Sequence, residues 1–211
     1  MLPRAFMSML VASILALAPV CASAAGDQEA QTFIRDLAQK AMTTVAVRNI
    51  SDEERDENFR HLFISAFDIP EIGKFVLSRQ WRLITPEKQA EFLKEFENTQ
   101  VVSWARRFKT YNGVRLETLG GRDEGDSAWL VDSQIIRPQA SPVSVQWHVH
   151  RDTDGSLRIT DIIVAGASMI LTHRDDYAAA LRSNGGSIDA LLATMRSGIE
   201  RERPLAASSP K

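Results

Sequence analysis

The spacing of the apolar residues changes near the middle of the chain, and this change restricts the fold more than any other feature. Up to about residue 109, apolar side chains recur every three or four residues, which is typical of amphipathic helices. From about residue 114 they alternate with polar residues or form short β-branched runs, which predicts strands at 114–119, 128–136, 142–151 and 157–164. Because the connections between them are short, we expect four antiparallel strands in a meander, with turns at 120–126, 137–142 and 152–155.

Helices are expected before and after these strands. Capping signals mark three starts: Ser51 with Glu54, Asp68 just before a proline, and Thr85 followed by Pro86. The predicted helices cover 30–47, 51–63, 68–76, 86–109 and 168–182, and a last one begins at 187. The sequence therefore predicts an α+β fold, in which N-terminal helices, a four-stranded antiparallel meander and C-terminal helices pack together.

The ends of the chain indicate export. Residues 1–24 combine an apolar run with a final Ala-Ser-Ala, which predicts a secretory signal peptide cleaved after Ala24. An uncleaved anchor or lipidation at Cys21 are the alternatives. Cleavage would leave one domain at 25–203 with no cysteine, followed by a polar tail at 204–211 that we expect to be disordered. The formal net charge of −2 offers no basic excess for nucleic acid.

Catalytic signals are weak. The chain has no nucleophile-elbow, zinc-protease, phosphate-loop or dinucleotide-binding motif. His148 and His150 share one face of a predicted strand, and Asp161 lies on the next strand along the chain. A His/Asp pair on a small curved sheet can perform acid–base chemistry, so an enzyme site at these three residues is the rival hypothesis. A solvated strand face explains the two histidines more simply, and we expect no metal site and no cofactor.

The opposite face of the same strand is apolar. Val145, Trp147 and Val149 alternate with the polar residues, and several large aromatic residues lie on the predicted helices. A closed hydrophobic core and an apolar binding pocket have the same pattern in sequence. These residues alone favour the core.

Two long segments carry a resemblance to a known family. They are FDIPEIGKFVLSRQWRLITPEKQAEFLKEF, residues 67–96, and DIIVAGASMILTHRDDYAAALRSNGGSIDALLATMR, residues 161–196. Their ordered patterns, with R-x-W-R before T-P-E in the first and a Gly-Gly-x-I-D-x-L helix in the second, resemble the MlaC family, also called the toluene-tolerance auxiliary family. The resemblance covers about residues 28–200.

The resemblance implies a periplasmic phospholipid carrier with no catalytic activity. Such a carrier holds acyl chains in an apolar pocket and moves the lipid between an outer-membrane lipoprotein complex and an inner-membrane ABC transporter with an MCE-domain subunit. Arg79, Arg82, Arg106 and Arg174 are the candidates to contact the head group or a partner. The expected pocket lining is Phe75, Trp81, Phe92, Phe96, Trp104, Phe108, Trp129, Val131, Val145, Trp147, Val149, Ile163 and Met169.

This chain departs from the family pattern beside the expected pocket. Ala165-Gly166-Ala167-Ser168 stands where many members have Glu-Gly-Val-Ser, and Thr172-His173-Arg174 stands where they often have Asn-Tyr-Arg. These departures resemble a branch of the family associated with hopanoid biosynthesis. A hopanoid, which is a rigid polycyclic lipid, is therefore the alternative ligand to a phospholipid.

Overall fold

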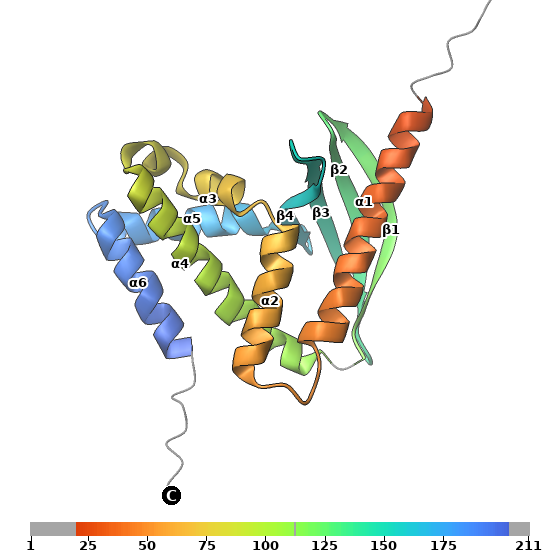
Figure 1. Ribbon diagram of the computed structural model, residues 1–211, viewed down its shortest axis with the longest axis horizontal. Helices are drawn as coiled ribbons and strands as arrows, with labels where there is room; N and C mark the ends of the chain where they lie inside the picture. The colour runs from red at the N-terminus through yellow and green to blue at the C-terminus, as the bar shows by residue number, and fades with distance from the viewer. Residues whose placement is uncertain (1–19, 112, 203–211) are drawn as a thin grey trace, which may run out of the picture.

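The computed structural model describes residues 20–111 and 113–202. The expected tail at 204–211 and most of the expected signal peptide at 1–24 lie outside these ranges. The chain forms an α+β fold, as expected, with a helical layer beside an antiparallel sheet (Figure 1). No helix in the described ranges is both long enough and apolar enough to span a membrane.

The sheet has five strands in the order of the sequence, all antiparallel to their neighbours. We expected four, so this count was wrong. The additional strand pairs with β4 across a tight turn at Ala165 and Gly166, whose φ angles are +49° and +85°. The strands are β1 Arg115–Gly125, β2 Ala128–Ile136, β3 Val143–Arg151, β4 Leu157–Val164 and β5 Ala167–Ser168.

Strand β1 is longer than the sequence pattern indicated. Gly120 and Gly121, which we assigned to a turn, lie inside the strand, and the turn falls at Asp126 and Ser127. Helix α1, Val20–Lys40, passes over this part of β1: a Cβ on Gly121 would lie 3.6 Å from the carbonyl oxygen of Asp27, which is an ordinary van der Waals contact. A Cβ on Gly120 would meet open space, so the packing of the helix does not require either glycine.

The helices begin at the expected capping residues. The side chains of Ser51, Asp68 and Thr85 accept hydrogen bonds from backbone N–H groups in the first turns that follow them. The fourth helix ends at Ala105, four residues earlier than expected, and continues as a 3-10 turn. The helical segments are α1 Val20–Lys40, a π-turn at Ala41–Val45, α2 Asp52–Ala66, α3 Ile69–Leu77, a 3-10 turn at Ser78–Leu83, α4 Pro86–Ala105, a 3-10 turn at Arg106–Thr110, α5 Met169–Ser183 and α6 Ile188–Glu202.

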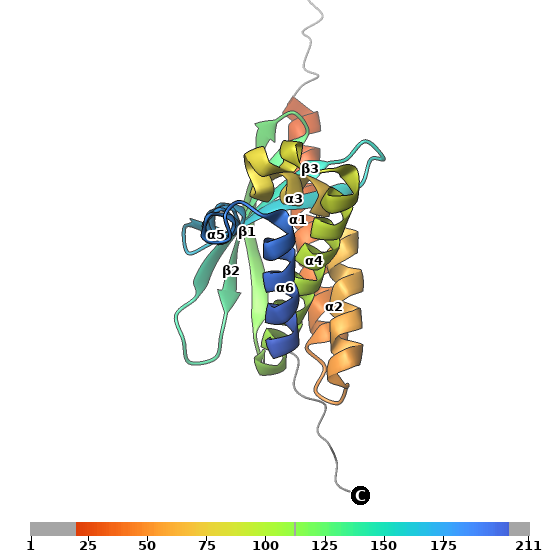
Figure 2. The same ribbon diagram turned by 90° about the vertical axis from the view of Figure 1, so that its left-hand side faces the viewer.

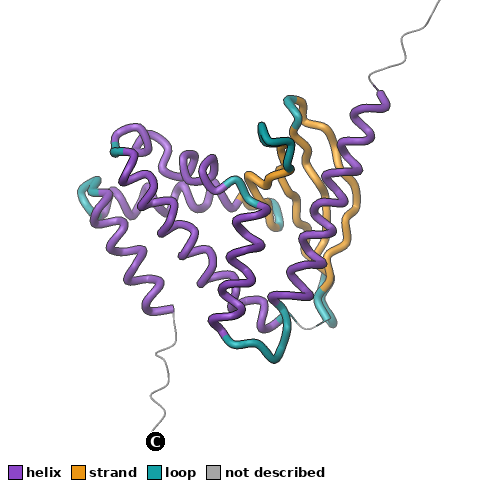
Figure 3. The backbone as a smooth tube through the Cα atoms, in the orientation of Figure 1, coloured by secondary structure: helices purple, strands orange, loops and turns teal. Residues whose placement is uncertain are grey.

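The apolar residues form two separate cores. One lies within the helical layer, where α4 packs between α2 and α6 (Figure 2), and its largest fully buried side chains are Phe92 and Phe96. The other lies between α1 and the sheet, and it includes Ile34, Trp129 and Val131. Figure 3 shows the strands and α1 on one side of the molecule and the remaining helices on the other. The two layers meet along one interface, which is where the main cavity lies.

Candidate functional site: an apolar cavity between the layers

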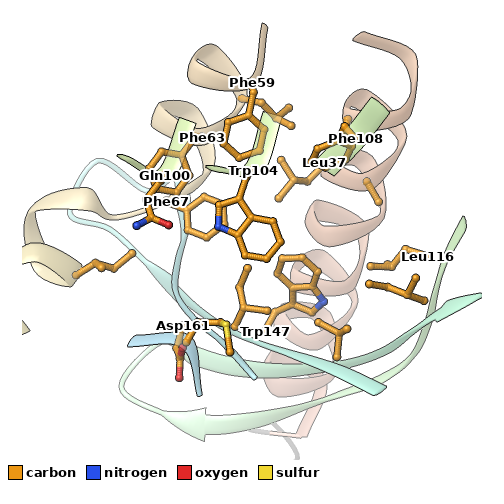
Figure 4. Close-up of a pocket in the computed structure, with 18 of the residues that line it drawn as sticks. Leu37, Phe59, Phe63, Phe67, Gln100, Trp104, Phe108, Leu116, Trp147 and Asp161 are labelled. Carbon is orange, nitrogen blue, oxygen red and sulfur yellow. The ribbon is translucent and has the colours of Figure 1, made fainter. Parts of the chain in front are cut away.

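A cavity of about 220 Å³ opens between the helical layer and the inner face of the sheet (Figure 4). Its walls come from the C-terminal end of α1, from α2 and α4, from the start of α5, and from four strands of the sheet. Most of the lining side chains are apolar, and among the described residues the lining contains no lysine or arginine. An apolar concave site without cations is suited to hydrocarbon rather than to an anion.

Two tryptophans approach each other across this cavity. Trp104 projects from α4 and Trp147 projects from β3, so each layer contributes one indole (Figure 4). Phe59 stacks on Phe63 with the ring centroids 5.9 Å apart, and Phe108 lies 5.8 Å from Phe59. The helical wall is therefore a continuous aromatic surface.

The register of the sheet explains why Trp147 faces the cavity. Trp147 pairs with Val131 on one side and with Ile162 on the other, and Ile162 also lines the cavity. The indole N–H donates to the hydroxyl of Ser133 at 2.9 Å, and this hydroxyl donates to the carbonyl of Val145 at 2.9 Å. Both polar groups are thereby satisfied within the sheet, and the wall presents carbon to the cavity.

Asp161 anchors α5 beside the cavity. One carboxylate oxygen accepts from the hydroxyl of Ser168 at 2.6 Å, and the other accepts from the backbone N–H of Ile170 at 3.1 Å. Figure 4 shows this carboxylate directed away from the two tryptophans. A negative charge at the N-terminus of a helix is stabilising, so Asp161 has a structural role that fully uses its two oxygens.

Four further polar residues line the cavity with no side-chain hydrogen bond to a described residue: Gln100, Tyr111, Thr160 and His173. Gln100 on α4 is only 5 % exposed, and His173 on α5 contacts the ring of Phe96 edge-on with the centroids 5.9 Å apart. Burial lowers the pKa of the His173 imidazole, and the carboxylates of Asp176 and Asp161 offset this only in part. The imidazole is therefore neutral near pH 7.

Six of the thirteen residues expected to form the pocket line this cavity: Phe96, Trp104, Phe108, Val145, Trp147 and Met169. The other seven do not. Phe92 lies in the helical core, Ile163 points to the opposite face of the sheet from Ile162, and two line a groove on the surface, Phe75 and Trp81. The remaining three are packed in the core beneath α1: Trp129, Val131 and Val149.

The sequence analysis missed the part of the lining that comes from the N-terminal helices. Phe59 and Phe63 lie four residues apart on α2, and Phe67 follows after another four. This regular aromatic spacing was the available signal, but an ordinary helix–helix core produces it too. The end of α1 also contributes Leu37 and Ala38, and the π-turn that follows it contributes Ala41 and Met42.

Three of the four candidate arginines gather away from the cavity. Arg79, Arg82 and Arg174 line a surface groove of about 380 Å³ between α3, the 3-10 turn that follows it, and α5. The Arg174 guanidinium lies 5.2 Å from the centre of the Phe75 ring. Arg106 is elsewhere, at the end of α4, where it adds to the effect of Lys109 in lowering the pKa of Asp52.

Each member of the rival histidine site has a different partner in the structure. His148 Nδ1 lies 2.9 Å from a carboxylate oxygen of Glu124, and His150 Nε2 lies 3.0 Å from one of Asp68. Asp161 is opposite His148 in the register but is bonded to Ser168 and Ile170 instead. Within the described ranges, no group of three or more His, Cys, Asp or Glu side chains is placed to hold a metal ion.

The fold and the cavity together define a class: an α+β protein whose sheet and helical layer enclose an apolar internal site. The family follows from the sequence, because the model of the MlaC protein family matches residues 30–197, and the chain belongs to that family. A solved structure of the phospholipid-binding protein from Ralstonia solanacearum, in complex with a phospholipid, is similar in fold, with a TM-score of 0.73. It is 16 % identical and the match covers 82 % of this chain and 98 % of that one, so it establishes the shared fold.

Proposed function

We propose that this protein is a periplasmic lipid carrier that holds the acyl chains of a phospholipid in the cavity between its two layers. The observation that carries the proposal is the apolar cavity itself, which has aromatic walls from both layers and, among the described residues, no cationic lining. Membership of the MlaC family and the phospholipid bound to the Ralstonia solanacearum protein support it. The protein acts by binding and transport rather than by catalysis.

The free energy of burying the acyl chains makes release of the lipid, rather than its capture, the difficult step. Burying roughly 30 methylenes of a two-chain lipid, at about 0.8 kcal/mol each, yields on the order of 24 kcal/mol. This exceeds the practical limit of non-covalent affinity, roughly 18 to 21 kcal/mol. The carrier therefore needs to recover only part of that free energy, and it needs a way to open.

The arrangement of the two cores suggests how the cavity opens. Its volume of about 220 Å³ lies below the roughly 300–1,000 Å³ of sites that enclose drug-sized ligands, so a two-chain lipid requires the walls to move apart. Each layer has its own core, and the cavity lies between them. Opening therefore requires most of the helical layer to move relative to the sheet and α1, while the end of α2, whose Ala66 belongs to the core beneath α1, stays with the sheet.

Transfer requires partners on both membranes. In this proposal the signal peptide directs export to the periplasm, where the protein moves lipid between an outer-membrane lipoprotein complex and an inner-membrane ABC transporter with an MCE-domain subunit. The groove lined by Arg79, Arg82 and Arg174 shares no lining residue with the cavity. We therefore assign these three arginines to partner contact rather than to the head group.

Mass spectrometry of an organic extract from protein purified without detergent tests the proposal. A stoichiometric diacyl phospholipid is the expected result. A hopanoid or another polycyclic lipid would keep the carrier function but change its ligand, which is the alternative that the Ala165–Ser168 and Thr172–Arg174 departures favour. A folded, monodisperse sample that contains no lipid and takes up none from vesicles would contradict the proposal.

A further inference from the structure

Gln100 is a polar side chain placed where an apolar one would be expected. It faces the cavity from α4, one helical turn after Phe96 and one before Trp104, and it is only 5 % exposed. No residue of the described ranges forms a hydrogen bond with its amide, and Figure 4 shows it among the aromatic residues of the wall. The amide is not among the fully buried side-chain groups that lack a partner, so it is accessible from the cavity, where a bound molecule can reach it. A polar group held at an apolar wall in this way is available to hydrogen-bond a ligand.

His173 adds a second unpartnered polar group to the same wall. Its ring contacts that of Phe96, whose side chain lies next to Gln100 along α4, so both polar groups adjoin one phenylalanine. No described residue forms a hydrogen bond with either ring nitrogen. Asp161 differs from both, because its two oxygens are already occupied by Ser168 and Ile170.

The charge of the site restricts what these groups can bind. A neutral imidazole and an amide provide both donors and acceptors but carry no charge. A phosphate here would lose its hydration without meeting a cation, and it would approach the Asp161 carboxylate. A neutral oxygen within the hydrophobic part of a lipid avoids both penalties.

We propose that Gln100 and His173 bind a neutral oxygen of the lipid inside the cavity, so that the site distinguishes oxygen-bearing lipids from hydrocarbon of the same shape. This inference rests on the proposed carrier function. Two sources supply such an oxygen: the ester carbonyl of a diacyl glycerolipid and the hydroxyl of a polycyclic lipid. Either one places the head group, if present, outside the cavity.

The test uses matched lipids that differ only in this oxygen. Delipidated protein is titrated with dioleoyl phosphatidylglycerol and with its dialkyl ether analogue, and also with a hydroxylated triterpenoid and its parent hydrocarbon. Binding is followed by the fluorescence of Trp104 and Trp147. We expect the oxygen-bearing member of one pair to bind about tenfold more tightly, which is the effect of one buried hydrogen bond, and the pair that shows this preference identifies the source.

Gln100→Leu provides the second half of the test. The preference should disappear in this variant while the protein stays folded, because the amide that would bond the lipid oxygen has been replaced by hydrocarbon. Gln100→Met gives the same comparison if the leucine does not fold. Gln146→Leu is the control: Gln146 lies on the opposite face of the sheet and donates to Asp132 at 2.6 Å, so this change should leave the preference intact.

Results that contradict this inference can be distinguished from results that contradict the carrier function. If wild-type protein shows no preference in either pair, or if Gln100→Leu retains the preference, the inference is wrong and the carrier function stands. If wild-type protein binds none of the four lipids, the carrier function itself fails, and the inference fails with it.

Discussion

Residue identity alone does not separate the binding wall from the core, as two of the tryptophans demonstrate. Trp104 lines the cavity and has the guanidinium of Arg107 over its ring at 4.5 Å. Trp129 is 7 % exposed and is packed beneath α1, where a Cβ on Gly26 would lie 2.6 Å from the indole. One indole faces a cavity and the other fills a packed interior.

This contrast predicts that the same substitution mainly reduces stability at one tryptophan and mainly reduces lipid binding at the other. Trp129→Ala should lower the free energy of unfolding by about 3–5 kcal/mol, because it leaves a void under α1. Trp104→Ala should destabilise much less, since one side of the ring already faces empty space, but it should reduce the amount of co-purifying lipid. Urea denaturation and lipid quantification on both variants measure the two effects. Equal loss of stability would show that Trp104 is ordinary core.

His173 should make stability depend on pH. Because burial lowers its pKa, the folded protein binds fewer protons than the unfolded chain just below the ordinary histidine pKa of about 6.5. The free energy of unfolding should therefore decrease as the pH falls from about 7 to about 5.5, a range above that in which carboxylates are protonated. His173→Phe should flatten this dependence in urea titrations. An unchanged slope in His173→Phe would assign the effect to other groups.

At the scale of elements, the turn between β4 and β5 is strained. Ala165 has a φ of +49°, a conformation that a residue with a Cβ adopts at a cost of roughly 1–2 kcal/mol, and it precedes Gly166 at +85°. Both φ values are those of a type I′ hairpin turn, for which Asn-Gly is the favoured pair. The strain is confined to this exposed two-residue loop.

Ala165→Asn should therefore stabilise the protein by about 1 kcal/mol. The measurement is the midpoint of urea unfolding, with the slope unchanged. Ala167→Asn, two residues later in β5 where φ is not positive, is the matched control and should give no gain. A similar gain from both variants would indicate a general surface effect.

The same elements show what sequence patterns reveal. Helix starts were predicted correctly because Ser51, Asp68 and Thr85 act locally, through hydrogen bonds within one turn. Strand β5 was missed because its turn begins with alanine instead of asparagine or glycine. Gly120 and Gly121 were mistaken for a turn because paired glycines usually mark one, whereas the register places them inside β1, opposite Asp132 and Val131.

The candidate site was harder to predict than the fold for a related reason. Phe92 and Phe96 lie one turn apart on the same face of α4, yet only Phe96 reaches the cavity. The difference depends on how the two layers are placed, which neither periodicity nor residue type records. The sequence could indicate an apolar face of the helix. It could not indicate which residues of that face are packed in the core and which line the cavity.

At the scale of the whole molecule, the arginine groove and the cavity are separate sites. A substitution in one of them should therefore leave the function of the other unchanged. Arg79 and Arg82 have no acidic partner within the described ranges, and Arg174 lies within 4.0 Å of only the exposed Asp175. With Lys74, four cations line this groove against one carboxylate, that of Glu71, and this excess of positive charge suits an acidic surface on a partner protein.

Arg79→Glu combined with Arg82→Glu should leave the co-purifying lipid unchanged and, if the proposed MCE-domain subunit is the partner, slow the association with it several-fold, most strongly at low salt. Surface plasmon resonance at two ionic strengths measures the association, and mass spectrometry measures the lipid. Arg115→Glu on β1, whose side chain is 66 % exposed, is the control for charge reversal elsewhere. Loss of lipid from the double variant would reassign the groove to the head group.

The order of the strands has a consequence for how the protein acquires its cavity. Every strand of the sheet pairs with its neighbour in the sequence, so residues 115–168 need only short loop closures to assemble. The helical wall, in contrast, unites α4 with α6 and α3 with α5, which are distant along the chain. Hairpins close within microseconds, whereas such distant contacts form more slowly. We therefore expect the sheet to fold first and to expose the apolar face around Trp147 until the helices pack against it. A lipid or a chaperone can bind that face before the cavity has formed.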